Sequence, residues 1–231
     1  FRSLTKSVYD FLNEMGLKRY VNYFHIDEWS SLYMLYKYNK VYVSDITFGI
    51  TQFCTLKCEY CNSFIPKIKN PINYSLEEMK ETIQTYFQWV DEVNVLALCG
   101  GDAMVYPHFD ELLQWIVKEY YPRRAKHIEI YSNAVIVPTE MQLEFFKKNK
   151  IVYRFTDYSS MTGKQKITEV IELLERYDIM YDHVQFKEWY DCGYPQKSNG
   201  ISSEQGLINF FDMCDRKTCH GVWNNKIFFC S

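Results

Sequence analysis

Short apolar runs alternate with amphipathic stretches along most of the chain. Apolar runs with the length and composition of buried strands lie at 43–50, 93–99, 127–132, 151–156 and 180–186. Between them, apolar residues recur with helical spacing at 75–89, 109–120, 139–148 and 164–177. Repeated strand–helix units predict a parallel sheet with helical crossovers, which is an α/β fold. A partial barrel and a doubly wound open sheet both fit this order of elements.

The two ends of the chain depart from this alternation. Apolar residues near a 3.6 period predict helices within residues 1–40, separated by a turn at 27–28. Near the other end, Asn224 and Asn225 lie between two apolar runs and predict a hairpin turn, because Asn tolerates positive φ. A further strand is expected near 226–230.

The length of 231 residues fits one large domain with appendages. We expect a helical extension, an α/β domain and a cysteine-rich segment, at 1–42, 43–190 and 191–231. The net charge of −3 lacks the basic excess of nucleic-acid and membrane-surface binders, so neither partner is expected. With no apolar run of about 18 residues and no signal peptide, a cytoplasmic protein is expected. Because the chain opens at Phe1 and stops just after Cys230, we expect the native chain to extend further.

Eight cysteines are the strongest chemical feature of the sequence. A chain of this length has its own core and does not need disulfide staples, so metal ligation in a reducing compartment is favoured. Cys54, Cys58 and Cys61 follow the first predicted strand within one short loop. Thiolates select iron–sulfur clusters, zinc or copper(I), and three of them can hold three irons of a [4Fe–4S] cluster. A structural zinc knuckle, or three unrelated core cysteines, is the simpler alternative.

With the aromatic Tyr60 before the last cysteine, these cysteines resemble the CxxxCxΦC motif of radical S-adenosylmethionine (radical SAM) enzymes. The resemblance implies a partial (β/α)6 TIM barrel in which Cys54, Cys58 and Cys61 hold a [4Fe–4S] cluster and Tyr60 helps to shape the SAM site. It further implies that SAM binds the open iron and is cleaved to methionine and a 5′-deoxyadenosyl radical, which abstracts a substrate hydrogen. An electron donor such as flavodoxin or ferredoxin is then required.

Two other segments resemble the SAM-binding segments of that family. Gly100-Gly101-Asp102, after the second predicted strand, resembles the GGEP motif that binds the SAM amino group, with Asp102 in place of Glu. Glycine lets a backbone approach a ligand closely. Ser132 and Asn133, at the end of the third strand, resemble the TNG segment and are expected to hydrogen-bond the ribose or carboxylate of SAM. Ordinary turns at both places are the alternative.

Polar residues also follow the fourth and fifth predicted strands, and active sites are built at the carboxyl ends of barrel strands. Asp157, within the polar segment 156–158, is a candidate to face SAM or substrate, or else it caps the following loop. Glu188 and Asp191 are candidate acid–base groups. The combination of Trp189, Asp191 and Gly193 after this strand resembles a subgroup of radical SAM proteins suspected of acting on carbohydrates or surface polymers.

The C-terminal segment carries a second group of cysteines, Cys192, Cys214, Cys219 and Cys230. The last three are spaced Cys-x4-Cys-x10-Cys, which resembles the SPASM or twitch auxiliary-cluster segments of radical SAM enzymes. The resemblance implies a second [4Fe–4S] cluster, with Cys192 as its fourth ligand or with one iron open to substrate. Cys192 is also a candidate hydrogen-atom donor in an epimerisation. Zinc ligands or loose core thiols are the alternative, and Cys99 is expected to be an ordinary apolar residue.

Three functions fit these features. The first, favoured by the motifs, is a radical SAM enzyme that oxidises, epimerises or cross-links a carbohydrate or peptide. The second is a zinc- or iron–sulfur-binding interaction module without turnover. The third is a redox carrier that only shuttles electrons. Cleavage of SAM separates the first function from the other two.

Overall fold

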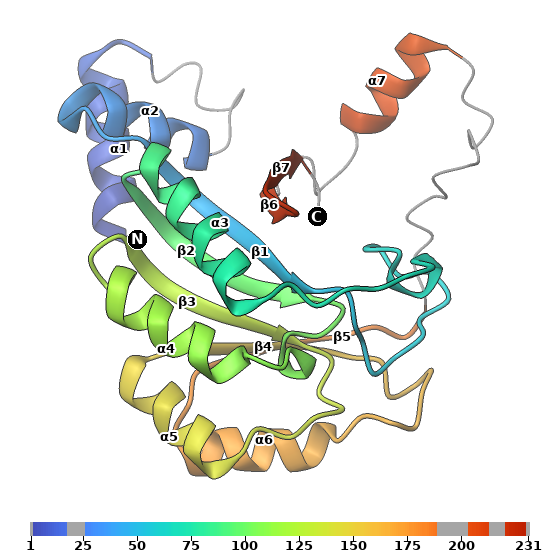
Figure 1. Ribbon diagram of the computed structural model, residues 1–231. Helices are drawn as coiled ribbons and strands as arrows, with labels where there is room; N and C mark the ends of the chain where they lie inside the picture. Colours follow the sequence, from blue (N-terminus) through green and yellow to red (C-terminus); the bar gives the residue numbers. More distant parts are fainter. Residues whose placement is uncertain (1, 18–25, 189–202, 213–219, 230–231) are drawn as a thin grey trace.

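A computed structural model describes residues 2–17, 26–188, 203–212 and 220–229 (Figure 1). This part of the chain contains a seven-stranded sheet in the order β5-β4-β3-β2-β1-β6-β7. Adjacent strands from β1 to β5 are parallel. β6 is parallel to β1 and antiparallel to β7. The strands are β1 (Tyr42–Thr51), β2 (Glu92–Gly100), β3 (Ala125–Ser132), β4 (Val152–Asp157), β5 (Tyr181–Gln185), β6 (His220–Trp223) and β7 (Lys226–Phe229).

Strands β1 to β5 are neighbours in the order in which they occur in the chain. Right-handed crossovers that always step in the same direction leave every crossover helix on one face of a sheet. Four helices cover that face and share one core with the strands (Figure 1). They are α3 (Leu76–Trp89), α4 (Phe109–Tyr120), α5 (Glu140–Asn149) and α6 (Ile167–Arg176).

The predicted α/β class is confirmed, and the arrangement decides between its two forms. A doubly wound sheet carries helices on both faces, whereas α3 to α6 share a single core. The sheet is open, because β5 and β7 are its edge strands. The fold is therefore a partial TIM barrel.

Local signals in the sequence explain where the crossover helices begin. Ser75 accepts a hydrogen bond from the Glu78 backbone, and the Glu78 carboxylate accepts one from the Ser75 N–H. Thr139 and Gln142 form the same reciprocal capping box at the start of α5. Each box satisfies two backbone donors that a helix terminus leaves free. The predicted helix starts at these two positions are confirmed.

The N-terminal residues form two helices, α1 (Arg2–Glu14) and α2 (Ile26–Tyr38). They enclose a second, smaller core together with the first residue of β1. The turn predicted at 27–28 is wrong, because α2 begins at Ile26 and both residues lie in its first turn. The buried residues of this core are Val8, Leu12, Trp29, Tyr33, Met34 and Tyr42.

The predicted hairpin near the end of the chain is confirmed. β6 and β7 pair antiparallel, with Trp223 opposite Lys226. Asn224 and Asn225 form the turn with φ of 48° and 57°, and positive φ at both central residues matches the twist of the two strands. The sequence did not predict that β6 would lie beside β1, at the opposite edge from β5. A further helix, α7 (Glu204–Asp212), precedes the hairpin in the chain.

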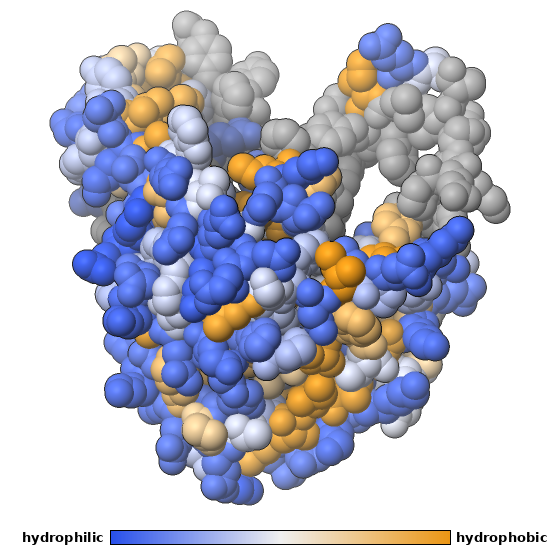
Figure 2. Space-filling view, in the orientation of Figure 1, coloured by the Kyte–Doolittle hydropathy of each residue, from blue (hydrophilic) through white to orange (hydrophobic). Residues whose placement is uncertain are grey.

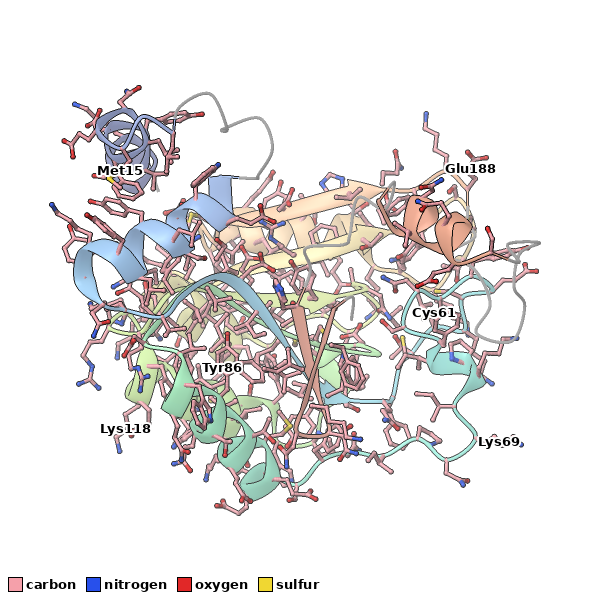
Figure 3. All side chains as sticks on the ribbon, turned by 90° about the horizontal axis from the view of Figure 1, so that it is seen from above. Met15, Cys61, Lys69, Tyr86, Lys118 and Glu188 are labelled. Atoms are coloured by element: carbon pink, nitrogen blue, oxygen red, sulfur yellow. The ribbon has the colours of Figure 1, made fainter. Side chains whose placement is uncertain are left out.

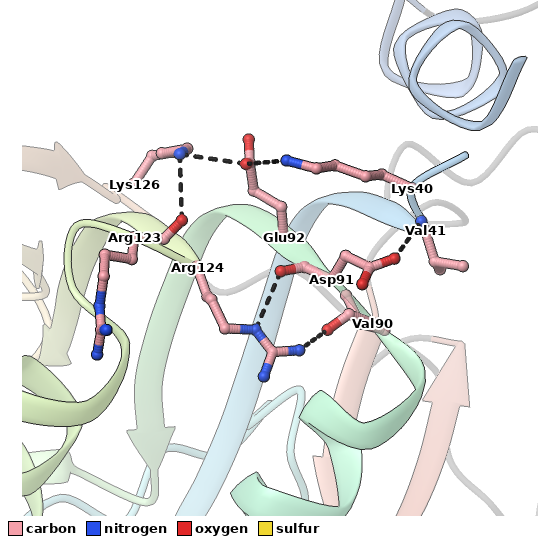
Figure 4. A network of polar contacts seen from close by, with 8 residues as sticks. All are labelled: Lys40, Val41, Val90, Asp91, Glu92, Arg123, Arg124 and Lys126. Atoms are coloured by element: carbon pink, nitrogen blue, oxygen red, sulfur yellow. Dashed lines mark hydrogen bonds and ion pairs between the residues drawn. The ribbon is translucent and has the colours of Figure 1, made fainter. Parts of the chain in front are cut away.

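The amino ends of the strands are tied together by a polar network (Figure 4). The Arg124 guanidinium donates to the backbone oxygens of Val90, 2.6 Å away, and Asp91, 3.1 Å away. The Asp91 carboxylate accepts from the backbone N–H of Val41 at 2.8 Å. Glu92 pairs with the ammonium group of Lys126 at 3.1 Å. This end of the sheet lies opposite the cysteine loop, which follows the carboxyl end of β1.

The helix-covered face is mostly hydrophilic, with a narrower apolar band across it (Figure 2). None of the helices in the described ranges is long and apolar enough to span a bilayer.

Candidate functional site

The first three cysteines lie on the loop that follows the carboxyl end of β1. Cys54, Cys58 and Cys61 are half-buried free thiols. Viewed from above the sheet, Cys61 and Glu188 lie at one end of the strands and Met15 of the N-terminal helices at the other (Figure 3). The cysteine loop is therefore at the carboxyl end of the sheet, where parallel α/β folds build their sites.

The glycine loop after β2 holds the cysteine loop through backbone hydrogen bonds. The N–H of Gly101 donates to the oxygen of Thr51 at 3.0 Å, and the N–H of Asp102 donates to that of Phe53 at 3.0 Å. The Thr51 hydroxyl accepts from the Phe53 N–H at 3.0 Å and lies 2.5 Å from Asn73 Oδ1. These bonds continue the β1–β2 pairing past the ends of the strands, so the two loops form one unit.

The two glycines are required by this close approach. A Cβ on Gly101 would lie 2.1 Å from the Phe53 oxygen, and one on Gly100 would lie 2.4 Å from the Thr51 oxygen. Gly100 also has φ of +158°. Any side chain at either position would collide with backbone, which cannot move aside cheaply. Glycine is thus needed at both positions so that the cysteine loop can pack against this backbone. This requirement is separate from the role toward SAM that the motif implies.

Asp102 is buried, with 1% of its surface exposed. One carboxylate oxygen accepts from the Met104 N–H at 2.9 Å. The other accepts from the Asn133 N–H at 2.9 Å and the Ser132 hydroxyl at 3.2 Å. Burial raises the pKa of Asp102, although these three hydrogen bonds oppose the shift. The carboxylate therefore joins the ends of β2 and β3, and it has almost no surface left for a ligand.

Asn133 connects the end of β3 to the cysteine loop. Its side-chain amide donates to Thr55 Oγ1 at 2.9 Å and to Cys54 Sγ at 3.3 Å. Its side-chain oxygen accepts from the Val135 N–H at 3.0 Å. The backbone N–H of Leu56 also donates to Cys54 Sγ, at 3.4 Å. The structure thus brings the segments after β1, β2 and β3, which the motifs singled out separately, into one hydrogen-bonded group.

The three thiols influence one another electrostatically. Burial raises the pKa of Cys58 to about 11, with further increases from Cys61 and Cys54. Burial also raises the pKa of Cys54, although hydrogen bonds from Leu56 and Asn133 oppose the shift. A bound metal centre reverses this effect, because it stabilises the thiolate form of its ligands.

The donor set fits an iron–sulfur cluster. In the described residues, no three Cys, His, Asp or Glu side chains converge as they would around one metal ion. Thiolate sulfurs are the protein ligands that iron–sulfur clusters take. Three neighbouring thiols on one loop, with N–H groups donating to one of them, are suitable cluster ligands.

The comparisons with known proteins agree with this geometry. Residues 48–180, more than half of the chain, match the family model described as the radical SAM superfamily. The chain belongs to the radical SAM superfamily. No curated protein sequence matches it.

Three solved structures are similar to this chain at low sequence identity. BtrN in complex with AdoMet and 2-DOIA aligns with a TM-score of 0.53 and 15% identity, over 81% of this chain and 72% of that one. Polyhistidine-tagged anSMEcpe with bound AdoMet aligns with a TM-score of 0.46 and 17% identity, over 60% of this chain. Streptococcus suis SuiB bound to S-adenosylmethionine aligns with a TM-score of 0.43 and 16% identity, over 81% of this chain and 53% of that one. The chain spans 41% of the length of anSMEcpe.

In this radical SAM protein Gln165, a residue that the sequence analysis did not single out, joins the end of β4 to the end of β3. Gln165 donates to the backbone oxygens of Asn133 at 2.5 Å and Thr156 at 2.7 Å, and accepts from the Tyr158 N–H at 2.6 Å. Burial raises the pKa of Tyr158; a hydrogen bond with Thr156 opposes the shift, and the charges of Cys58, Cys61 and Cys54 add to it. A lone Gln in a loop carries no sequence signal of this role.

Asp157 is buried at the end of β4. It accepts from the Ser159 N–H at 2.7 Å and from the Gln185 side chain at 3.1 Å. Burial acts to raise the pKa of Asp157, but hydrogen bonds from Ser159 and Gln185 outweigh it and leave the pKa below its ordinary value. The carboxylate thus caps its own loop and joins β4 to β5, as the structural alternative predicted; a role in the reaction stays a prediction.

A charged group missed by the sequence analysis lies on the face of the sheet turned away from the helices. Ile128, Ile130, Tyr153 and Phe155 belong to the helix-side core, so the residues between them point to the opposite face. Arg154 pairs there with Glu129 at 2.7 Å and with Asp182 at 3.0 Å. The Tyr131 hydroxyl lies 3.4 Å from the same Glu129 oxygen. We call Glu129, Tyr131, Arg154 and Asp182 the inner-face group.

The remaining predicted site residues are either exposed or outside the described residues. Tyr60 is exposed on the cysteine loop, and Glu188 is exposed after β5. The second group of cysteines lies outside the described residues, as does the segment with Asp191 and the aromatic pair at 189–190. These cysteines are Cys192, Cys214, Cys219 and Cys230.

Proposed function

We propose that this radical SAM protein cleaves SAM reductively at a [4Fe–4S] cluster held by Cys54, Cys58 and Cys61, and abstracts a hydrogen atom from a carbohydrate or peptide. The observation that carries the proposal is the cysteine loop at the carboxyl end of β1, bonded to the loops after β2 and β3. Bound there, the cluster would supply the electron that cleaves SAM. The chain's own residues would place SAM and substrate around it and limit the access of water.

In this proposal the SAM site is shaped by the segments around the cysteine loop. The candidates are Tyr60, Gly100, Gly101, Asp102, Ser132 and Asn133. Backbone oxygens of the glycine segment suit an ammonium group, and the amide of Asn133 suits a carboxylate or hydroxyl. Asp102 would act mainly by holding Ser132 and Asn133 in position, because its carboxylate is buried and already bonded to both residues.

The substrate would lie over the inner-face group. Its two carboxylates and one guanidinium carry a net charge of −1, with a phenol beside them. Such a surface offers hydrogen-bond acceptors and donors to hydroxyl and amide groups, which both carbohydrates and peptides carry. Asp157, at the adjoining end of β4, is a candidate to act on the same substrate.

The C-terminal cysteines are proposed to hold a second [4Fe–4S] cluster. Cys214, Cys219 and Cys230, with Cys192 as a fourth ligand, follow the SPASM or twitch spacing. Such a cluster would accept an electron from the substrate radical that hydrogen abstraction leaves, which completes an oxidation, or would anchor the substrate. Cys192 would alternatively donate a hydrogen atom in an epimerisation. A flavodoxin or ferredoxin would supply electrons, and we propose a cytoplasmic location.

The test is anaerobic reconstitution with iron and sulfide, followed by EPR of the reduced protein with and without SAM. We expect SAM to change the spectrum and 5′-deoxyadenosine to accumulate. Cys58→Ala should abolish both effects. Cys99→Ala is the matched control, because burial raises the pKa of that thiol to about 12 and it lies on β2 rather than on the cysteine loop.

The alternative function is a zinc- or iron–sulfur-binding module without turnover, including an electron carrier. A protein that holds only zinc, or a cluster whose EPR signal does not respond to SAM, would establish this alternative. The absence of 5′-deoxyadenosine from the wild-type protein under reducing conditions would agree with it.

A further inference from the structure

A chain of hydrogen bonds runs from Asp102 through Asn133 to Cys54. Asp102 accepts from the Asn133 N–H at 2.9 Å, and the Asn133 side-chain amide donates to Cys54 Sγ at 3.3 Å. The three residues come from the segments after β2, β3 and β1, and 79 positions separate Asn133 from Cys54. We call this the Asp102–Asn133–Cys54 chain.

Hydrogen bonds hold both the backbone and the side chain of Asn133. Its backbone N–H is bonded to Asp102 and its backbone oxygen accepts from Gln165 at 2.5 Å. Its side-chain oxygen accepts from the Val135 N–H at 3.0 Å, which sets the orientation of the amide. The NH2 group is thereby directed at Thr55 and Cys54. A side chain fixed in this way loses little entropy in making a weak N–H···S bond.

Asp102 is suited to holding Asn133 and poorly suited to binding a ligand. It is 1% exposed, and both carboxylate oxygens accept hydrogen bonds from the protein. Asp is one methylene shorter than the Glu that the family motif carries at this place. The shorter side chain keeps the carboxylate at the end of β3.

Cys54 Sγ receives two N–H donors, from Asn133 and from the Leu56 backbone at 3.4 Å. Hydrogen bonds to a cluster thiolate stabilise negative charge on sulfur, and a reduced cluster carries one more negative charge than an oxidised one. Each such bond therefore favours reduction and raises the potential of the cluster.

We propose that Asp102 is a positioning residue which, through Asn133, sets the reduction potential of the cluster at Cys54. Asp102 need not contact SAM in this role. The inference rests on the proposed function, since it requires a cluster on Cys54, Cys58 and Cys61.

The test is the midpoint potential of the reconstituted cluster, measured without SAM so that any contact to SAM makes no contribution. Asn133→Ala removes one N–H donor, and we expect a more negative potential. Asp102→Asn replaces one of the two acceptor oxygens with an NH2 donor, which weakens the hold on the Met104 and Asn133 backbone. It also removes a negative charge, and loss of the charge alone moves the potential in the positive direction. The two variants are therefore combined in a double-mutant cycle.

We expect the effect of Asp102→Asn to differ between the wild-type and Asn133→Ala backgrounds, because most of it acts through Asn133. In the Asn133→Ala background only the positive shift from the lost charge should remain. An unchanged or more positive potential in Asn133→Ala would overturn the proposal. An equal effect of Asp102→Asn in both backgrounds would also overturn it, and would make Asp102 a plain charge near the cluster.

Failure of this inference is distinguishable from failure of the proposed function. A wild-type protein without a SAM-responsive cluster refutes the proposed function. A wild-type protein with that cluster, whose potential does not respond to Asn133→Ala, refutes the inference alone. Ser132→Ala removes one hydroxyl donor from Asp102 and the acceptor of the Ala134 N–H, but it keeps the Asp102 charge. It provides a milder variant for the cycle if Asp102→Asn does not retain iron.

Discussion

The α-carbon of Gly101 lies so close to the cysteine loop that an added Cβ would be 2.1 Å from the carbonyl oxygen of Phe53. The neighbouring N–H of Asp102 donates to that same oxygen at 3.0 Å. The contact joins the loop after β2 to the residue just before Cys54. It makes the geometry of the cysteines depend on a residue in another strand–helix unit.

Gly101→Ala should therefore disturb the cysteine loop. We expect a loss of about 1–3 kcal/mol in the free energy of unfolding, because the clash is with backbone, and a lower iron content after reconstitution. Gly163→Ala is the control, since a Cβ there meets nothing within 4 Å. Iron analysis and urea unfolding check both variants. Full iron content in Gly101→Ala would show that the loop tolerates the displacement.

Arg124 should contribute to stability without affecting the site. Its guanidinium donates to backbone oxygens of Val90 and Asp91 and lies 4.8 Å from the centre of the Phe87 ring. Arg124→Met keeps an apolar stem and leaves these oxygens without their donor, so we expect a loss of about 2–3 kcal/mol. SAM cleavage at a temperature where the protein is folded should be unchanged.

Arg123→Met is the matched control for this prediction. Arg123 makes an exposed hydrogen bond to the Glu119 oxygen at 3.1 Å, so its replacement should cost less than about 0.5 kcal/mol. Equal losses in the two variants would contradict the role assigned to Arg124.

Glu129 should make stability decrease as pH rises. Burial raises the pKa of Glu129 above its ordinary value of 4.5, although Arg154 opposes the shift. Between 4.5 and the raised pKa, the folded protein binds more protons than the unfolded chain, so the free energy of unfolding falls as pH increases. Glu129→Gln removes this contribution, and we expect a shallower fall in urea-unfolding measurements above pH 4.5.

Part of the slope should remain in Glu129→Gln, because burial also raises the pKa of Asp102. Asp182→Asn changes the exposed partner of Arg154 and serves as the comparison. A slope in Glu129→Gln equal to that of the wild-type protein would mean that Glu129 does not change its protonation on folding in this range.

The C-terminal cysteines should account for a second set of irons. We expect the reconstituted wild-type protein to bind about eight irons, and Cys214→Ala/Cys219→Ala to bind about four. The double variant should keep a cluster whose EPR signal responds to SAM, because Cys54, Cys58 and Cys61 are intact. Equal iron contents in the two proteins would refute the auxiliary cluster.

The sequence by itself determined the elements and the family. Apolar runs and helical spacing predicted β1 to β5 and α3 to α6 to within a few residues, because burial on one face imposes a period on the sequence. The caps at Ser75 and Thr139, which the structure shows, are also local, because a capping box joins residues three positions apart. The spacing of the three cysteines on one loop indicated the family, since all of them lie within eight consecutive positions.

Only the tertiary structure decided which residues from different segments meet. No local pattern could show that β6 lies beside β1, that Asn133 reaches Cys54, or that Gly101 leaves room for the Phe53 backbone. The Arg154 pairs with Glu129 and Asp182 also join residues on separate strands, and their register appears only when the sheet forms. Such contacts depend on packing between segments that are distant in the sequence. A single sequence does not show which of these distant residues come into contact.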